Sequence, residues 1–201
     1  MFAIIQAAGW PIWPLLLTSV LAVAFIIERS IALRRSKIVP AGLLQSVIAD
    51  YRQAGVNDEM LARLANHSPL GRVFAAGLRN VKSTREVMKE SIEEAGRGTT
   101  HELERFLTSL GTIASIAPLM GLFGTVVGMI EIFGSSMGSG NNPQQLAHGI
   151  SVALYNTGFG LVIAIPSMVA FRHFRALVDG LLVDMEQEAV KLVEMVHGER
   201  K

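Results

Sequence analysis

The chain has 201 residues, of which 50% are hydrophobic and 17% are charged, and its formal net charge is +1. This composition is too apolar for an ordinary soluble domain of this length, and the balanced charge does not favour a nucleic-acid-binding protein. The chain has no cysteine, which excludes a disulfide framework, a thiolate metal site and a thiol nucleophile.

Charged residues are segregated along the sequence. All 18 lysines and arginines fall in residues 29–105 and 172–201. The remaining segments, residues 1–28 and 106–171, contain only two charged residues, Glu28 and Glu131. A charged side chain at the centre of a bilayer costs about 2.5 to 3.5 kcal/mol on insertion scales. The segments without basic residues are therefore predicted to lie in a membrane.

Three apolar stretches, at residues 10–27, 112–133 and 150–171, each have about the 20 residues needed to cross a hydrocarbon core. The predicted fold is an all-α membrane protein with three transmembrane helices. Its segments are an N-terminus with the first span (1–27), a cytoplasmic helical region (28–111), the second span (112–133), a periplasmic loop (134–149), the third span (150–171) and a cytoplasmic C-terminal helix (172–201).

The orientation follows from the positive-inside rule. Both basic segments are placed in the cytoplasm, so the N-terminus and the loop after the second span lie on the other side of the membrane. Trp10 and Trp13 lie at the outer end of the first span, where amphipathic rings favour the headgroup region. The C-terminus is predicted to be cytoplasmic.

The cytoplasmic segment is predicted to consist of short helices, because Pro40 and Pro69 interrupt it. Asn57 precedes two acidic residues in the manner of a helix N-cap. Ser83 and Glu86 have the spacing of a capping box, which predicts another helix start at Ser83.

Long helices are predicted to continue from the second and third spans into the cytoplasm. No proline occurs between Thr84 and Pro118, so a single helix could run from the cytoplasm into the second span. From Phe171 to Val196, apolar residues recur at steps of three and four, which is typical of a helical stripe. Either copies of the same chain or an intramolecular bundle could bury such a stripe, and we expect copies of the chain.

The second and third spans each carry a face of small and polar residues. On the second span it comprises Ala117, Gly121, Gly124, Thr125 and Gly128, and on the third span Ala153, Asn156, Thr157, Gly160, Ala164 and Ser167, with Ser151 and Tyr155 near the outer half. Such faces either pack closely together or line a lumen, and spacing does not decide between these alternatives. Pro118 and Pro166 each free a backbone carbonyl, which could serve a cation path or only kink the helix.

Glu131 is a functional candidate because it is an ionisable group within a predicted span. It lies about one turn from the outer end, so either a role in an ion path or contact with interfacial water is compatible with its position. The glycine-rich segment 134–142 lacks the Lys-Ser/Thr ending of a phosphate-binding loop, and Ser151 is not in a nucleophile-elbow pattern. The sequence therefore predicts no enzyme activity, no cofactor and no metal site.

Two segments carry a family resemblance. Residues 117–130 (APLMGLFGTVVGMI) resemble the second-span signature of the ExbB/TolQ/MotA proton-channel family. Residues 149–157 (GISVALYNT), with the continuation to residue 167, resemble its third-span signature, and the chain is most similar to ExbB. The Glu28–Arg29 pair that closes the first span is also similar to the family.

The resemblance implies a homo-oligomeric ring, pentameric in this family, in the bacterial inner membrane. The ring would enclose an ExbD-like single-span partner that carries a titrating Asp, with Thr125 and Thr157 as polar contacts to that partner. The implied function is to use the proton motive force to energise TonB-dependent outer-membrane transport through a TonB-like protein. A TolQ-like role in envelope integrity and a passive membrane scaffold are the alternatives. Val152 departs from the pattern, because many relatives have Glu at this place.

Overall fold

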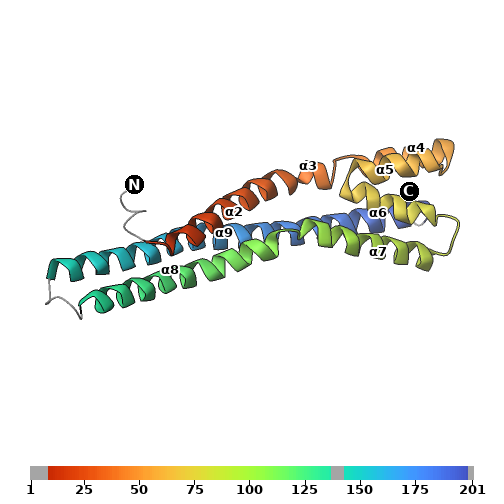
Figure 1. The fold of residues 1–201 in the computed structure, drawn as a ribbon. Coiled ribbons are helices and arrows are strands. Elements are labelled where there is room, and N and C mark those ends of the chain that lie inside the picture. The colour runs from red at the N-terminus through yellow and green to blue at the C-terminus, as the bar shows by residue number, and fades with distance from the viewer. Residues whose placement is uncertain (1–8, 137–142, 199–201) are drawn as a thin grey trace. The chain divides into compact units, whose positions relative to one another are not determined.

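The computed structural model describes residues 9–136 and 143–198, and within these ranges the chain is helical without a strand (Figure 1). Residues 137–142 of the predicted periplasmic loop and the side chain of Val152 lie outside the described residues, and the rest of that predicted loop is helical. The helices are α2 (Ile12–Ala32), α3 (Arg35–Ile38), α4 (Leu43–Ala54), α5 (Asp58–His67), α6 (Pro69–Arg79), α7 (Arg85–Leu103), α8 (Leu107–Ser136) and α9 (Pro143–Val196).

Among the described residues, three helical segments, in α2, α8 and α9, are long and apolar enough to cross a membrane, in agreement with the three predicted spans. The chain divides into two compact units. The first unit comprises Met1–Arg29 and Phe106–His173, and the second comprises Ser30–Arg105 and Phe174–Lys201.

The first unit contains the apolar spans, and its large side chains point outward. Leu119, Phe123 and Ile130 on α8 and Val162 and Val169 on α9 are all more than half exposed. Its buried positions in α8 and α9 include many alanines and glycines. This distribution is the reverse of that in a soluble domain and suits a bundle surrounded by lipid or by other apolar helices.

The second unit has an ordinary apolar core. Phe74 and Leu78 of α6, Met88 of α7 and Leu192 of α9 are fully buried. The apolar stripe of the C-terminal helix is therefore real, but it is buried within the chain. Our expectation that copies of the chain bury this stripe was wrong, because α9 packs into a core that the chain itself supplies.

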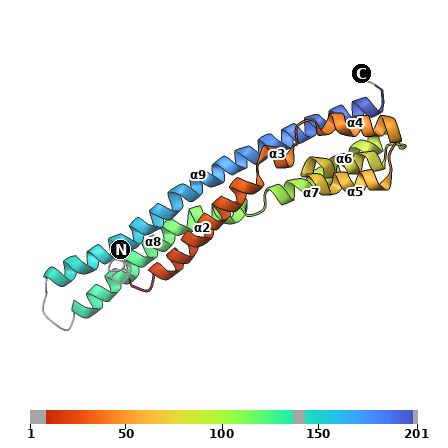
Figure 2. The ribbon, with the colours of Figure 1, turned by 90° about the horizontal axis from the view of Figure 1, so that it is seen from above.

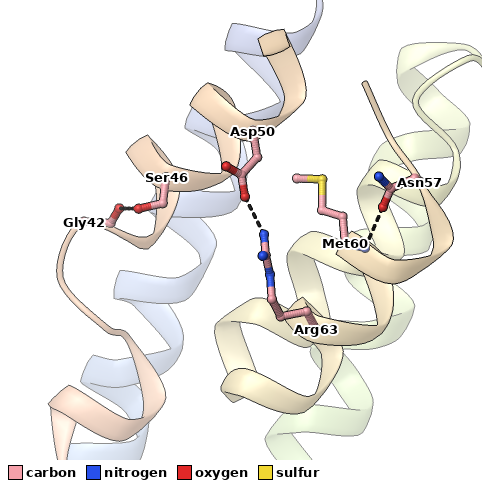
Figure 3. Close-up of polar contacts among 6 residues, drawn as sticks. All are labelled: Gly42, Ser46, Asp50, Asn57, Met60 and Arg63. Carbon is pink, nitrogen blue, oxygen red and sulfur yellow. Dashed lines mark hydrogen bonds and ion pairs between the residues drawn. The ribbon is translucent and has the colours of Figure 1, made fainter. Parts of the chain in front are cut away.

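The helix starts in the second unit are set by local caps. Asn57 caps α5 as predicted, since its Oδ1 accepts a hydrogen bond from the Met60 amide at 2.7 Å (Figure 3). The predicted start of α7 was wrong by one residue, because Thr84, not Ser83, provides the cap. In the same region Arg63 forms a 2.5 Å ion pair with Asp50, which joins α5 to α4 (Figure 3).

Replacing Asn57 by alanine is expected to destabilise the start of α5 by about 1 kcal/mol, because the Met60 amide loses its acceptor. Amide hydrogen exchange over residues 58–67 of the purified protein would measure the change. Asn66→Ala is the matched control on the same helix, since the exposed Asn66 donates to the Ala62 carbonyl and caps no helix start. Equal exchange rates in both variants would contradict the capping role.

The helix leading into the second span is interrupted, so the prediction of one unbroken helix from Thr84 was wrong. The α7 helix ends at Leu103 and α8 begins at Leu107, although residues 104–106 include neither glycine nor proline. Phe106 adopts a left-handed backbone with φ of 63°, which ends a right-handed helix. By contrast, α9 is continuous over 54 residues, which confirms the predicted extension of the third span (Figure 2).

Contacts within the first unit hold this unusual residue. The Phe106 ring stacks on Phe25 of α2, with centroids 5.0 Å apart and ring planes inclined by 13°. The Arg29 guanidinium lies 5.5 Å from the centre of the same ring and binds both carboxylate oxygens of Glu28. Arg29 is buried, so its aromatic and acidic contacts replace water around the charge. The sequence carries no signal for the role of Phe106.

Candidate functional site

The predicted small-residue faces of α8 and α9 meet in one antiparallel seam. A Cβ atom added at Gly121 would lie 2.8 Å from the Asn156 carbonyl oxygen, and one at Gly160 would lie 2.6 Å from the Ala117 carbonyl oxygen. Both neighbours are backbone atoms, which cannot move aside cheaply. The two helices therefore approach so closely because glycine occupies these positions.

Further toward the C-terminal end of α8, the seam holds a polar side chain. Asn156 is 1% exposed, and its Cβ and Cγ would lie 2.6 and 2.7 Å from a Cβ added at Gly124. One turn on, a Cβ at Gly128 would lie 3.5 Å from the Ala153 Cβ, which is ordinary contact. Gly124 thus provides the space that the Asn156 amide occupies.

Both prolines lie inside unbroken helices. Pro118 is within α8 and Pro166 is within α9, and neither ends its helix. Pro118 is half-buried and Pro166 is exposed. Because proline lacks an N–H group, the backbone carbonyl four residues before each proline does not receive the usual intrahelical hydrogen bond.

The hydroxyl groups of the two spans differ in their hydrogen bonds. Thr125 donates to the Leu122 carbonyl at 2.6 Å, and Ser151 and Ser167 donate to the carbonyls four residues earlier at 2.9 and 2.7 Å. Such bonds to the same helix are the usual state of an intramembrane hydroxyl. The Thr157 Oγ1 is buried and, among the described residues, has no hydrogen-bond partner. Of these four hydroxyls, that of Thr157 is the one without a hydrogen-bond partner in the described residues.

Thr125 and Thr157 lie on the same side of the seam. Each follows a seam residue, Gly124 and Asn156 respectively, and one residue advances a helix by about 100°. Because the two helices run antiparallel, these equal rotations point to the same side of the helix pair. We call the side that bears Thr125 and Thr157 the threonine flank. Beside Thr125, an open groove of about 520 Å³ follows α8 between Thr125 and Gly134.

The other predicted polar residues lie elsewhere in the chain. Tyr155 is 41% exposed and lies two residues before Thr157, which turns it by about 200° around α9. Ser151 and Glu131 are exposed. Each is six residues from the threonine of its own helix, so the two side chains point about 120° apart around the helix axis. Within one chain the structure therefore groups Thr125 with Thr157, buries Asn156 beside them, and separates Tyr155, Ser151 and Glu131 from them.

The site has the character of a path for ions or of a contact for another helix. Among the described residues, no group of three or more His, Asp or Glu side chains could hold a metal ion. The threonine flank offers hydroxyl oxygens in apolar surroundings, which can exchange hydrogen bonds with water, a cation or a carboxyl group.

Comparison with known proteins identifies relatives of one kind. Residues 65–187, more than half of the chain, match the model of the MotA/TolQ/ExbB proton channel family. Biopolymer transport protein ExbB-like 3 of Synechocystis sp. is 34% identical over 177 residues, which cover 86% of this chain and 83% of that protein. Biopolymer transport protein exbB1 of Vibrio cholerae is 30% identical over 188 residues, covering 90% of this chain and 82% of the relative. Tol-Pal system protein TolQ of Haemophilus influenzae is 27% identical over 187 residues, covering 84% and 82%.

Proposed function

Because the chain belongs to the MotA/TolQ/ExbB proton channel family, we propose that it is the ExbB-like, ring-forming subunit of an ion-driven motor in the bacterial inner membrane. The motor uses the proton motive force, together with an ExbD-like single-span partner, to energise TonB-dependent outer-membrane transport. In this proposal the N-terminus is periplasmic and the C-terminus cytoplasmic, in agreement with the segregation of basic residues.

The observation that carries the proposal is the Thr157 hydroxyl on the threonine flank, which has no hydrogen-bond partner in the described part of the chain. An unpaired hydroxyl in an apolar environment is costly, so it persists where another group satisfies it in the working assembly. In the ring, the threonine flank faces the lumen, and the Asp of the partner helix provides the group that Thr157 and Thr125 contact. Protonation of that Asp removes the cost of a charge in apolar surroundings, so the partner can move past the flank.

Val152 leaves the ring without the carboxylate that many relatives have in the third span. The proposed path therefore relies on the partner's Asp and on neutral oxygens of this chain. Glu131, Tyr155 and Ser151 lie away from the threonine flank. We assign Glu131 and Tyr155 to the outer mouth or to contacts between neighbouring copies, whereas Ser151, whose hydroxyl bonds its own helix, takes no part in the path.

Replacing Thr157 by valine tests the proposal, because valine keeps the shape and removes the hydroxyl. We expect ion flux through the reconstituted complex with its single-span partner to fall about tenfold, equivalent to the loss of one hydrogen bond of about 1.4 kcal/mol. Thr125→Val is expected to have a smaller effect, since its hydroxyl already bonds its own helix. The measurement is ion flux into proteoliposomes under an imposed proton gradient.

Ser151→Ala is the matched control, because Ser151 also bonds its own helix and lies away from the threonine flank. It is expected to leave the flux unchanged. Normal flux in Thr157→Val would remove this residue from the path, and absence of flux in the wild-type complex would favour the passive scaffold.

A TolQ-like role in envelope integrity is the second candidate, supported by the similarity to TolQ of Haemophilus influenzae. The two motor functions are distinguished by the partner that co-purifies with the chain. Loss of energised uptake in a deletion strain supports the ExbB-like role, and loss of envelope integrity supports the TolQ-like role.

A further inference from the structure

Asn156 is an unusual residue for its position in the seam. Its neighbours along the crossing, Ala153 and Gly160 on the same helix and Gly121 and Gly124 on α8, are all glycine or alanine. Close packing alone needs only such small residues. Burying an amide in apolar surroundings costs free energy unless its polar atoms are satisfied. The presence of Asn156 therefore needs a reason other than close packing.

The geometry ties this amide to the adjacent threonine. Nδ2 of Asn156 would lie 3.1 Å from a Cβ added at Gly124, so the amide rests against the backbone of α8. Thr157 is the next residue, about 100° further around α9, and its hydroxyl is left unbonded. The backbone of Thr157 already borders the seam, since its Cα would lie 3.0 Å from a Cβ added at Gly121. A rotation of α9 by about 100° would carry the Thr157 side chain into the seam and the Asn156 side chain out of it.

We propose that Asn156 is a positioning residue for the ion path, which fixes the rotation of α9 against α8 and so keeps the Thr157 hydroxyl on the threonine flank. The two adjacent polar side chains compete for the seam, and Asn156 occupies it because Gly124 leaves room for the amide. A single buried Asn sets helix register in other helical assemblies by the same physical means. This inference rests on the proposed function of Thr157.

A disulfide across the seam can report the rotation directly. The chain has no cysteine, so within one chain two introduced cysteines can pair only with each other. A Cβ at Gly128 would lie 3.5 Å from the Ala153 Cβ, which is within the range for a disulfide. Ala153 lies on the same face of α9 as Asn156, so rotation of α9 would carry it away from Gly128. Disulfide formation in the double variant Gly128→Cys, Ala153→Cys therefore reports the rotation of α9 relative to α8.

The first experiment adds Asn156→Ala to this pair in the full chain, co-expressed with its single-span partner. We expect the rate of disulfide formation to fall by at least about threefold, since alanine removes the amide that competes with Thr157 for the seam. Ser167→Ala is the matched control, because Ser167 is equally buried on α9 but bonds the Ile163 carbonyl of its own helix. It is expected to leave the rate unchanged. An unchanged rate in Asn156→Ala overturns the proposal.

The second experiment measures ion flux in the chain without introduced cysteines. Asn156→Ala is expected to lower flux about fivefold, and Asn156→Ala combined with Thr157→Val is expected to be no worse than Thr157→Val alone. This non-additivity follows because Asn156 acts through Thr157. Multiplicative losses, or normal flux in Asn156→Ala, overturn the positioning role.

The two inferences fail in different ways. If Thr157→Val leaves flux normal, the proposed path itself is wrong. If Thr157→Val lowers flux while Asn156→Ala changes neither flux nor crosslinking, only the positioning role is wrong. Should Asn156→Ala not accumulate in the membrane, Asn156→Ser takes its place, because a serine can bond its own helix as Ser151 and Ser167 do. The same loss of crosslinking is then expected, and retention of the wild-type rate overturns the proposal.

Discussion

Gly160→Ala is expected to destabilise the chain by about 1 to 3 kcal/mol, the usual cost of overpacking a closely packed interface. The added methyl group would lie 2.6 Å from the Ala117 carbonyl oxygen and 3.1 Å from the Gly121 Cα. These are backbone atoms of α8, so the two helices must separate along the seam. The free energy of unfolding of the detergent-solubilised chain, measured in a denaturing-detergent titration, checks this expectation.

Gly158→Ala provides the matched control on the same helix, two residues away. A Cβ atom at Gly158 would meet nothing within 4 Å, and the residue is exposed. Alanine is favoured over glycine in a helix by about 1 kcal/mol, so this variant should unfold at the same or a higher denaturant concentration. If the two alanine variants were equally stable, the close crossing at Gly160 would be contradicted.

The second large effect is expected at Phe106. Here the relative stability of an alanine and a glycine variant tests the left-handed backbone. Phe106→Ala removes the stacking on Phe25 and the contact with Arg29 but keeps the left-handed backbone, and should cost about 1.5 to 3 kcal/mol. Phe106→Gly loses the same contacts and relieves the backbone strain. It should therefore be more stable than Phe106→Ala by about 1 kcal/mol.

In a helix interior the glycine variant would be less stable than the alanine variant, because glycine has the lower helix propensity. The unfolding titration used for the seam variants measures both proteins. Greater stability of Phe106→Ala than of Phe106→Gly would show that residues 104–106 continue a right-handed helix. Thr112→Ala and Thr112→Gly supply the reference pair, since the exposed Thr112 lies within α8 and the alanine variant should be the more stable.

Much of the fold was predictable because it depends on local terms. Three spans followed from apolar stretches and from the absence of basic residues in them, since each charge has its own transfer cost. The cap at Asn57 followed from three neighbouring residues, and the continuation of α9 followed from its apolar stripe. Each of these signals lies within a few turns of the element that it specifies.

The candidate site was predictable only as a set of residue types. Spacing placed small and polar residues on one face of each span, but it left packing and a lumen as alternatives. Ser151 and Tyr155 were predicted near the polar face of the third span, and Glu131 was a candidate because it is ionisable within a span. The direction of a side chain around its helix, relative to the seam, separates them from the threonine flank.

The sequence by itself determined which segments are apolar, how many could span a membrane and which family the chain resembles, because hydropathy and motifs are properties of contiguous residues. Only the tertiary structure decided that Phe106 interrupts the helix and that the C-terminal stripe is buried within the chain. It also decided which hydroxyl lacks a hydrogen bond in the described residues: Thr125, Ser151 and Ser167 bond their own helices, and Thr157 does not. The reason is physical: these outcomes depend on which atoms from distant parts of the chain come within contact distance, and no local preference encodes that.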